Sequence, residues 1–286
     1  MRISVVTPNF NMASYLEDTI TSVIGNLRPG DEYFVIDGGS SDGSVDIIRR
    51  YEPGLTGWIS ETDAGYAEAL AKGFERASGD VLCWINAGDM YLSGAFEVAR
   101  NLVTHDVDMI FGDDLYIDEN NKVLAFSRGW VPDLRVAMLY GGWTPLQDAC
   151  FWRRDLYRKV GGIDRALRFA ADYDLFLRMA LAGRAAYTPI TFSAFRRHAG
   201  QKSISGSTSY EQERMRVRVR ELDALDSGAL RKVIYRGLSR AAMSARARLA
   251  PRLWRRSDLV GKSVESLCCA AYWPVRAVSP AGSEAR

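Results

Sequence analysis

Apolar positions in the first hundred residues follow two alternating periods. Four short apolar runs predict buried strands, at 3–7, 33–36, 58–60 and 81–85. Between them, apolar side chains recur at helical spacing, and we expect helices at 14–26, from 44, at 64–78 and at 95–103. We expect Pro8 to end the first strand, Ser14 and Glu17 to form a capping box, and Ser44 to cap the second helix. Strands that alternate with helices predict a parallel sheet with helices on both faces.

Polar side chains follow each of these four strands. The four groups are Thr7-Pro8-Asn9, Asp37-Gly38-Gly39, Glu61-Thr62-Asp63 and Asn86-Ala87-Gly88-Asp89. In an open α/β sheet, ligands bind at the carboxyl ends of the strands. Because four consecutive strand ends carry polar or acidic groups, the sequence predicts one binding site at this edge of the sheet.

The pattern changes after Asp108. Short apolar runs at 109–112, 115–117 and 123–126 predict antiparallel additions to the sheet. Helices are expected at 155–160 and 172–182, and a closing strand at 186–191. After Gly206 the pattern is helical. We therefore expect an α/β catalytic domain over residues 1–206 and a basic helical extension over residues 207–286.

The composition excludes several classes of protein. None of the four cysteines belongs to a C-x-x-C pair, so we expect buried thiols in a reducing compartment, without a disulfide framework or a zinc site. The N-terminus has no apolar segment of signal-peptide length. The longest late apolar run, 267–275, is far shorter than the about 20 residues that a spanning helix needs. These features predict a cytoplasmic protein that does not cross a membrane by itself.

Charge is distributed unevenly along the chain. Residues 207–286 carry 16 Lys and Arg against 8 Asp and Glu, whereas residues 1–206 carry 21 against 27. Apolar residues between 230 and 249 recur at helical spacing among arginines, and Trp254 follows. A basic amphipathic helix of this kind suits an anionic membrane surface, here the inner face of the cell membrane. The same stripe would equally pack on the catalytic domain or on a second subunit of a homo-oligomer. Nucleic acid is not an expected partner, because no motif that contacts bases is present.

Five motifs occur in order along residues 1–206: VVTPNFNMASYLEDTITSV, VIDGGSSDGS, SETDAGYAEALAKGFERASGD, WINAGD and AADYDLFLRM. As an ordered set they resemble the family 2 glycosyltransferases, which have a GT-A fold and build bacterial polysaccharides from nucleotide sugars. The resemblance implies a Rossmann-like, mostly parallel sheet flanked by helices, and a hexosyltransferase whose donor is a nucleoside-diphosphate sugar, with UDP favoured. The implied acceptor is a saccharide, either free or on a lipid carrier.

The resemblance also implies donor-binding positions. Asp37 matches an aspartate that accepts the ring N–H of the base, and the small Gly38 lets the backbone approach the nucleoside. The other matching donor positions are Thr7, Pro8, Asn9, Asp63, Lys72 and Asn86. From the residues alone, Asp37 could instead form an Asx turn, Asp63 could cap the following helix, and Lys72 could be a solvated helix lysine.

Asn86 to Asp89 occupies the place of the family's metal-binding DxD motif. Asn86 and Gly88 replace the usual acids and leave Asp89 as the one carboxylate. Mg²⁺ or Mn²⁺ would neutralise charge on the departing diphosphate, and we expect weak metal binding without the donor. His198 resembles a residue of a late loop that could ligate the metal. Basic residues of that loop could pair with phosphate oxygens, namely Arg196, Arg197 and Lys202. Alternatively, the loop is merely solvated and Asp89 caps a helix.

Asp172 matches the first acid of the family's xDYDL pattern. The resemblance implies that it is the catalytic base, which takes the proton from the acceptor hydroxyl in one inverting displacement. An acid at the start of a helix is also favoured by the helix dipole alone. We expect Asp174 to support structure. The remaining matches belong to the acceptor site, namely Asp113, Asp114, Gln147 and Asp148, although Leu146 stands where the family has a histidine. From the residues alone, the adjacent Asp113 and Asp114 could simply be solvated.

The predicted function is therefore an inverting, metal-dependent glycosyltransferase of cell-surface polysaccharide biosynthesis. A catalytically weakened protein that binds a nucleotide sugar or a lipid head group is the alternative, because the motif from Asn86 to Asp89 has lost acids. A nucleotidyltransferase would use a similar sheet but needs a Gly-rich, basic loop after the first strand. Residues 9–13 contain neither Lys nor Arg, which argues against that class.

Overall fold

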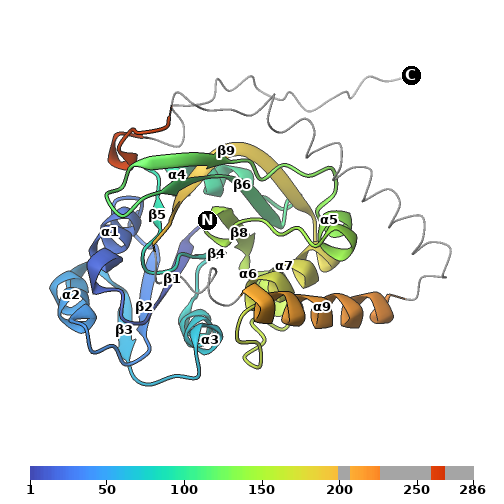
Figure 1. Ribbon diagram of the computed structural model, residues 1–286, viewed down its shortest axis with the longest axis horizontal. Coiled ribbons are helices and arrows are strands. Elements are labelled where there is room, and N and C mark those ends of the chain that lie inside the picture. Colours follow the sequence, from blue (N-terminus) through green and yellow to red (C-terminus); the bar gives the residue numbers. More distant parts are fainter. Residues whose placement is uncertain (199–206, 226–258, 268–286) are drawn as a thin grey trace.

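The computed structural model describes residues 1–198, 207–225 and 259–267. Nine strands in these ranges form one sheet in the order β3-β2-β1-β4-β8-β6-β9-β5, with β7 paired to β6 (Figure 1). The bounds are β1 Ile3–Asn9, β2 Glu32–Asp37, β3 Gly57–Ser60, β4 Val81–Trp84, β5 Met90–Tyr91, β6 Met109–Ile117, β7 Val123–Ser127, β8 Cys150–Arg153 and β9 Ala185–Arg196. The strands β1 to β4 run parallel, as the sequence predicts.

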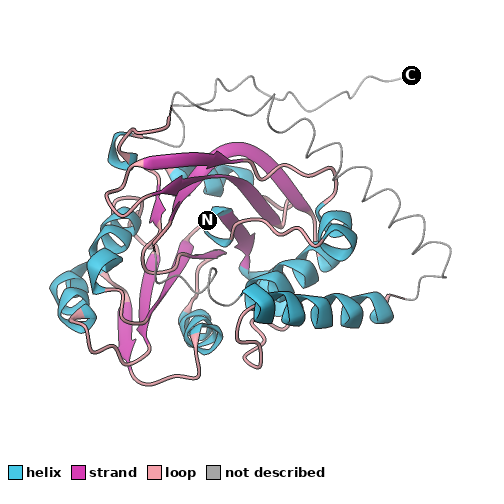
Figure 2. Ribbon diagram, in the orientation of Figure 1, coloured by secondary structure: helices cyan, strands magenta, loops and turns pink. Residues whose placement is uncertain are grey.

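Helices cover both faces of this sheet (Figure 2). Their bounds are α1 Ala13–Ile24, α2 Ser44–Tyr51, α3 Tyr66–Arg76, α4 Ala95–Leu102, α5 Leu134–Gly141, α6 Arg154–Lys159, α7 Ala171–Ala182 and α9 Ser207–Ala224. Successive strand residues point to opposite faces, so β1 contributes to two cores. Val5 packs with α1, α2 and α4, whereas Val6 packs with α3, α5, α7 and α9. The predicted α/β architecture is confirmed.

The Asp42 carboxylate accepts hydrogen bonds from the first residues of both α1 and α2. Asp42 Oδ2 accepts a hydrogen bond from Ala13 N at 2.8 Å, and its Oδ1 accepts from Ser44 N at 3.0 Å and Ser44 Oγ at 2.6 Å. Neither α1 nor α2 has a side-chain cap at its own N-cap residue. The predicted caps at Ser14 and Ser44 were wrong, because a side chain from the loop after β2 reaches both helices.

Two strand predictions also need correction. Pro8 does not end the first strand. It lies inside β1, where it is the register partner of Ile36 in β2, and its carbonyl accepts a hydrogen bond from Ala87 N at 3.3 Å. The runs at 109–112 and 115–117 form one strand, β6, whose register is irregular between Phe111 and Asp114. β6 is antiparallel to β7 and β8 but parallel to β9, so the additions are not all antiparallel. The sequence analysis did not predict α5.

Two segments beyond residue 206 pack on the rest of the molecule. Val217 and Leu222 of α9 join the core that contains α5 and α7. In the segment 259–267, Leu259 and Val264 are buried against Leu115 and neighbouring residues of the sheet. The predicted domain boundary falls at residues outside the described ranges and stays a prediction. The apolar stripe from 230 to 249 and Trp254 also lie outside them. Within the described ranges, no helix combines the length and apolarity needed to cross a bilayer.

Candidate active site

Asp37 ends β2 as a fully buried carboxylate with five hydrogen-bond donors. Oδ1 accepts from Asn9 Nδ2 at 2.6 Å and Ser40 Oγ at 2.5 Å. Oδ2 accepts from Gly39 N at 3.1 Å, Ser40 N at 2.9 Å and Ser60 Oγ at 2.7 Å. Burial opposes ionisation, but the hydrogen bonds outweigh it and hold the pKa of Asp37 below its ordinary value. The Asx turn is therefore present, and a base could bond Asp37 only by replacing one of these donors.

The three residues of β1 that were predicted to bind the nucleotide sugar differ in the polar atoms that they offer to a ligand. Thr7 is fully buried, and its hydroxyl lies 3.0 Å from the Tyr33 hydroxyl, so its side chain does not face the strand ends. Pro8 is buried within the strand. Asn9 donates to Asp37, while its own Oδ1 is buried and has no partner among residues 1–198, 207–225 and 259–267. Of these three residues, Asn9 is the one with a polar atom left for a ligand.

Backbone hydrogen bonds bring the strand ends together around β1. Gly38 N donates to Asn9 O at 2.9 Å, and Ala87 N donates to Pro8 O at 3.3 Å. The segments after β2 and after β4 are thus fixed on either side of the same strand. This confirms that these polar groups meet at one edge of the sheet.

The segment after β3 reaches the same edge. A Cβ at Gly38 would lie 3.1 Å from an oxygen of the Asp63 carboxylate, so a larger residue would require that carboxylate to shift by a few tenths of an ångström. Asp63 Oδ1 accepts from Gly65 N at 2.8 Å but does not cap α3, whose N-cap is Gly65. Lys72 is not a solvated lysine, because its side chain is only 16% exposed and its Nζ lies 2.8 Å from Glu61 Oε1. Lys72 thus ties α3 to the end of β3.

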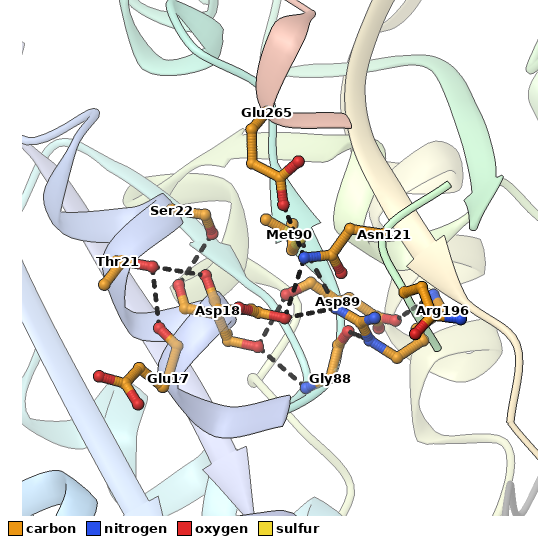
Figure 3. Close-up of polar contacts among 12 residues, drawn as sticks. Glu17, Asp18, Thr21, Ser22, Gly88, Asp89, Met90, Asn121, Arg196 and Glu265 are labelled. Atoms are coloured by element: carbon orange, nitrogen blue, oxygen red, sulfur yellow. Dashed lines mark hydrogen bonds and ion pairs between the residues drawn. The ribbon is translucent and has the colours of Figure 1, made fainter. Parts of the chain in front are cut away.

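Arg196 lies at the centre of the polar contacts around Asp89 (Figure 3). Its backbone N donates to Asp89 Oδ1 at 2.9 Å, and its Nε donates to Gly88 O at 2.7 Å. Its two other nitrogens donate to Asp118 O and to Asp18 Oδ2, each at 3.0 Å. The side chain is fully buried. The expectation that Arg196 would bind phosphate was wrong, because protein groups use its guanidinium.

The residues that follow Arg196 have different surroundings. His198 packs its ring against Tyr15, with 5.5 Å between ring centroids. Burial and the charge of Arg196 lower the pKa of His198, which favours the neutral imidazole that metals bind. Arg197 is exposed and lies over the Tyr116 ring at 4.3 Å. Lys202 lies outside the described residues.

Three buried carboxyls gather beyond the end of β4, namely Asp89, Asp114 and Asp148. Burial raises the pKa of each, and the charge of Asp148 raises the pKa of Asp89 and of Asp114 further. Ser193 Oγ donates to Asp114 Oδ1 at 3.0 Å. Ser193 and the backbone N–H groups of Asp148 and Ala149 lower the pKa of Asp148 against the larger effect of burial. The alternative that Asp114 is merely solvated is wrong, because its carboxyl is buried.

A divalent cation fits the donor set at Asp89 only in part. Asp89 supplies a carboxylate, Asn86 lies in the same turn, and the buried Gln147 side chain lies beside Asp89, where its amide lowers the pKa of Asp89. These are oxygen donors of the kind that Mg²⁺ and Mn²⁺ bind. Within residues 1–198, 207–225 and 259–267, no group of three acidic, histidine or cysteine side chains could hold a metal alone. The set therefore suits a cation that brings phosphate oxygens with it.

Asp172 is the second residue of α7 and is partly buried. Its Oδ1 accepts from Tyr173 N at 2.7 Å, and no other hydrogen bond to its carboxylate is seen among the described residues. Burial raises the pKa of Asp172 to about 6, against the opposing effect of the Arg214 charge. A carboxyl with a pKa close to neutral can take up and release a proton under physiological conditions.

Cys150 of β8 links Asp172 to the three-carboxyl cluster. Burial raises the pKa of its thiol, and the charges of Asp148, Asp172 and Asp114 raise it further. Asp172 and the cluster therefore act electrostatically on the same buried atom.

Two further acids have structural surroundings. Asp113 Oδ1 accepts from Gly129 N at 2.9 Å and from Tyr187 OH at 2.8 Å, so this carboxylate anchors the chain after β7. Asp113 and Asp114 are adjacent strand residues and point to opposite faces, which separates Asp113 from the cluster. Asp174 is fully buried and forms ion pairs with Arg178 and Arg220. Its expected structural role is confirmed.

The sequence analysis missed three residues of this region. Phe10 follows Asn9 and is 56% exposed, which is unusual for a phenylalanine. Its position directly after a buried strand could have revealed it. Tyr66 of α3 and Glu213 of α9 contact the loop before Asp172. No local pattern marks them, because their partners lie far away in the sequence.

Known proteins share sequence with this chain over most of its first two thirds. A model described as glycosyl transferase family 2 matches residues 4–161, more than half of the chain. The chain belongs to glycosyl transferase family 2. A family relative, an uncharacterized glycosyltransferase of Mycobacterium tuberculosis, is 32% identical over 186 residues, which cover 63% of this chain and 69% of the relative. The putative teichuronic acid biosynthesis glycosyltransferase TuaG of Bacillus subtilis is 33% identical over 98 residues, which cover 33% of this chain and 39% of TuaG.

Solved glycosyltransferase structures share the fold. S. aureus TarS in complex with UDP-GlcNAc has a TM-score of 0.67 at 15% identity, covering 90% of this chain and 77% of that one. The mannosyltransferase PcManGT of Pyrobaculum calidifontis, in complex with GDP-Man and Mn²⁺, has a TM-score of 0.59 at 17% identity, covering 86% and 75%. In a longer TarS structure, this chain spans 46% of the TarS chain. The GT-A expectation is confirmed.

Proposed function

We propose that this family 2 glycosyltransferase moves a hexose from a nucleoside-diphosphate donor to a saccharide acceptor, with inversion at the anomeric carbon. The observation that carries the proposal is the place of Asp172 in the first turn of α7, where burial raises its pKa to about 6. TarS with UDP-GlcNAc and PcManGT with GDP-Man support a nucleotide-sugar donor, and TuaG supports a polysaccharide acceptor. UDP remains our favoured nucleotide.

In this proposal the strand ends hold the nucleoside. Asn9 Oδ1, which has no hydrogen-bond partner within the described part of the chain, provides an acceptor for a base N–H or a ribose hydroxyl. Asp37 would bind the base by exchanging one of its present donors, and Gly38 allows a close approach. The exposed ring of Phe10 offers a stacking surface for the base. Thr7 and Pro8 contribute through the β1 backbone, whereas Asp63 and Lys72 shape the neighbouring segment.

The metal site in this proposal consists of Asp89 with the amide oxygens of Asn86 and Gln147, and His198 as a further ligand. Bound Mg²⁺ or Mn²⁺ would supply positive charge against the leaving diphosphate. PcManGT, a protein of the same fold, contains Mn²⁺. The chain's own contribution is to keep these oxygen donors together and largely away from water.

Asp172 moves the proton in the proposed reaction. Its carboxylate accepts the proton of an acceptor hydroxyl while that oxygen forms a bond to the anomeric carbon. The bond from the anomeric carbon to the diphosphate oxygen breaks, and the nucleoside diphosphate leaves with the electron pair. Gln147 and Asp148 remain our candidates for acceptor contacts, since both are buried polar side chains that act electrostatically on Asp89. Asp113 is the weaker candidate because Gly129 and Tyr187 occupy its Oδ1.

In this proposal, residues 207–286 bind the anionic surface of a membrane. Residues 207–286 carry twice as many basic as acidic side chains, with 16 against 8. A basic surface would hold the enzyme near acceptors on lipid carriers at an anionic membrane. The division into domains 1–206 and 207–286 remains part of this proposal.

The donor site is tested by binding and turnover. We expect UDP with Mn²⁺ to raise the melting temperature of the full chain more than UDP alone, and more than GDP or dTDP with Mn²⁺. UDP-GlcNAc with Mn²⁺ should be hydrolysed slowly without acceptor, which an assay for released UDP detects. If none of the three nucleotides changes the melting temperature with metal present, the donor site does not exist.

A binding protein that has lost catalysis is the second candidate. It is favoured by the single carboxylate of the Asn86 to Asp89 segment, which would hold a catalytic metal weakly. Such a protein would be stabilised by nucleotide but would release no UDP, either as wild type or as Asp172→Asn.

A further inference from the structure

Glu213 is a buried carboxylate that reaches from α9 to the loop before α7. Its side chain is 8% exposed. Oε1 accepts from Arg168 N at 3.1 Å, and Oε2 accepts from Phe169 N at 2.8 Å and Ala170 N at 2.9 Å. Burying a carboxylate is costly unless hydrogen bonds compensate, and these three backbone N–H groups do so. Glu213 therefore fixes the three residues that lead into α7.

The start of α7 depends on this contact because its own sequence provides no cap. The N-cap residue is Ala170, which has no side-chain oxygen. Glu213 places a negative charge at this helix start, where the helix dipole favours it. Tyr66 of α3 holds the same turn from the other side, since its hydroxyl donates to Phe169 O at 3.0 Å and accepts from Ala171 N at 2.9 Å.

We propose that Glu213 is a positioning residue for Asp172. Its hydrogen bonds to the backbone of residues 168–170 fix where α7 begins and therefore the position of the Asp172 carboxylate. This inference rests on the proposed function, in which Asp172 is the base. It also means that α9, which lies beyond the region of the family match, completes the active site.

The hydrogen bonds of Glu213 to residues 168–170 preserve the buried surroundings of the Asp172 carboxyl. Ionisable groups that act electrostatically with Asp172 come from four elements: Tyr66 of α3, Cys150 of β8, Asp174 of α7, and Tyr210 and Arg214 of α9. Two of the five groups therefore belong to α9. If Glu213 no longer held α9 to the loop, water would reach the carboxylate and its pKa would fall toward the ordinary value of about 4.

The test uses the full chain with four substitutions. Glu213→Gln keeps the length of the side chain but removes its charge and one acceptor oxygen. Glu213→Asp keeps the charge but shortens the reach. Asp223→Asn is the matched control, because it removes one negative charge from an exposed position of the same helix. Asp172→Asn is the reference for loss of the base.

Two measurements are made on each folded variant. The first is the pH dependence of carbodiimide labelling at Asp172, read by peptide mass spectrometry, which needs no substrate because only the protonated carboxyl reacts. The second is kcat and KM for hydrolysis of UDP-GlcNAc with Mn²⁺. In Glu213→Gln we expect the labelling midpoint to fall by about one pH unit. We expect kcat to fall about tenfold or more while KM changes less than about twofold, since the donor contacts are intact.

The outcomes separate the inference from the proposed function. Asp223→Asn should match wild type in both measurements, and Glu213→Asp should resemble Glu213→Gln if reach matters. A folded Glu213→Gln with wild-type labelling and wild-type kcat would overturn the inference. So would the failure of both Glu213 variants to give a cooperative melting transition, because Glu213 would then be needed for folding alone. Full activity of Asp172→Asn would overturn the proposed base instead, and the labelling would still decide whether Glu213 sets the surroundings of Asp172.

Discussion

The fold shifts the pKa values of two candidate-site carboxyls, Asp37 and Asp172, in opposite directions. Asp37 accepts five hydrogen bonds, and its pKa is lowered. For Asp172 the carboxylate accepts one hydrogen bond among the described contacts, and burial raises its pKa to about 6. The partners of Asp37 all lie at the ends of β1, β2 and β3, whereas Asp172 is placed by contacts from α3 and α9.

This difference separates a fixed charge from a group that exchanges protons. A carboxylate saturated with donors stays ionised through the physiological range and suits a constant electrostatic or binding role. A carboxyl that burial destabilises in its charged form can accept a proton near neutral pH. The comparison therefore supports assigning binding to the Asp37 side and proton transfer to the Asp172 side.

The largest expected effect comes from removing the proton acceptor. Asp172→Asn should lower kcat for sugar transfer or donor hydrolysis by about 10³-fold, within the usual range for a general base. The wild-type kcat should rise with pH through about 6, because the base must be deprotonated. Nucleotide affinity should stay unchanged, as measured by titration with UDP and Mn²⁺. A variant with more than about a tenth of wild-type kcat would contradict the base assignment.

The next largest effect is on stability and tests the correction at Arg196. Arg196→Met removes a buried guanidinium and leaves polar groups around Asp18 and Gly88 without their donor. We expect a loss of about 3 kcal/mol in the free energy of unfolding, measured with urea. Arg197→Met is the matched control, because Arg197 is exposed, and it should cost less than about 1 kcal/mol. Equal losses in the two variants would mean that the burial of Arg196 has no energetic consequence.

A smaller effect on stability tests the fixed charge at Asp37. Asp37→Asn should lower the free energy of unfolding by about 2 kcal/mol at pH 7, since an amide nitrogen would face donors that the carboxylate now accepts. The folded pKa of Asp37 is lowered, so its contribution is complete above the unfolded pKa of about 4 and is lost as the pH falls through the folded pKa. The gap between wild type and variant in urea unfolding should therefore shrink in acid.

The exposed Asp46 of α2 provides the control for this measurement. Asp46→Asn should change the free energy of unfolding by less than about 0.5 kcal/mol at either pH. If the gap between wild type and Asp37→Asn were the same at pH 7 and in acid, the lowered pKa of Asp37 would not be the cause.

The same comparison explains how much the sequence could predict. The Asp37 side is built from the order of strands and from residues next to strand ends, and both leave local patterns in the sequence. Even there, the role of Asp42 was missed, because its carboxylate bonds the start of a helix 29 positions away. Local patterning predicts which groups meet at an edge but not how many donors each group already has.

The Asp172 side depends on contacts between distant segments. Glu213 bonds residues more than forty positions earlier, and Tyr66 bonds residues more than a hundred positions later. Arg196 was expected at a phosphate because a basic run in a loop favours solvent or anions, yet the strand β9 extends to include it and buries it. Neither outcome follows from spacing or composition, because both depend on how far a strand continues and which helix packs on its neighbours.

The smallest expected effect concerns Phe10, on the side of the site where the sequence predicted most. Its ring is 56% exposed directly after β1, and an aromatic face at this place would stack on a nucleobase. Phe10→Ala should weaken UDP binding by about 1 kcal/mol, or roughly fivefold in Kd, without changing the melting temperature of the free protein. Trp130→Ala is the control, because Trp130 is 37% exposed in a groove of about 480 Å³ beside Gly183, at the other end of α7 from Asp172. Stacking is a ligand contact and not a packing contact, so a loss of affinity that came with a lower melting temperature would instead assign Phe10 to the fold.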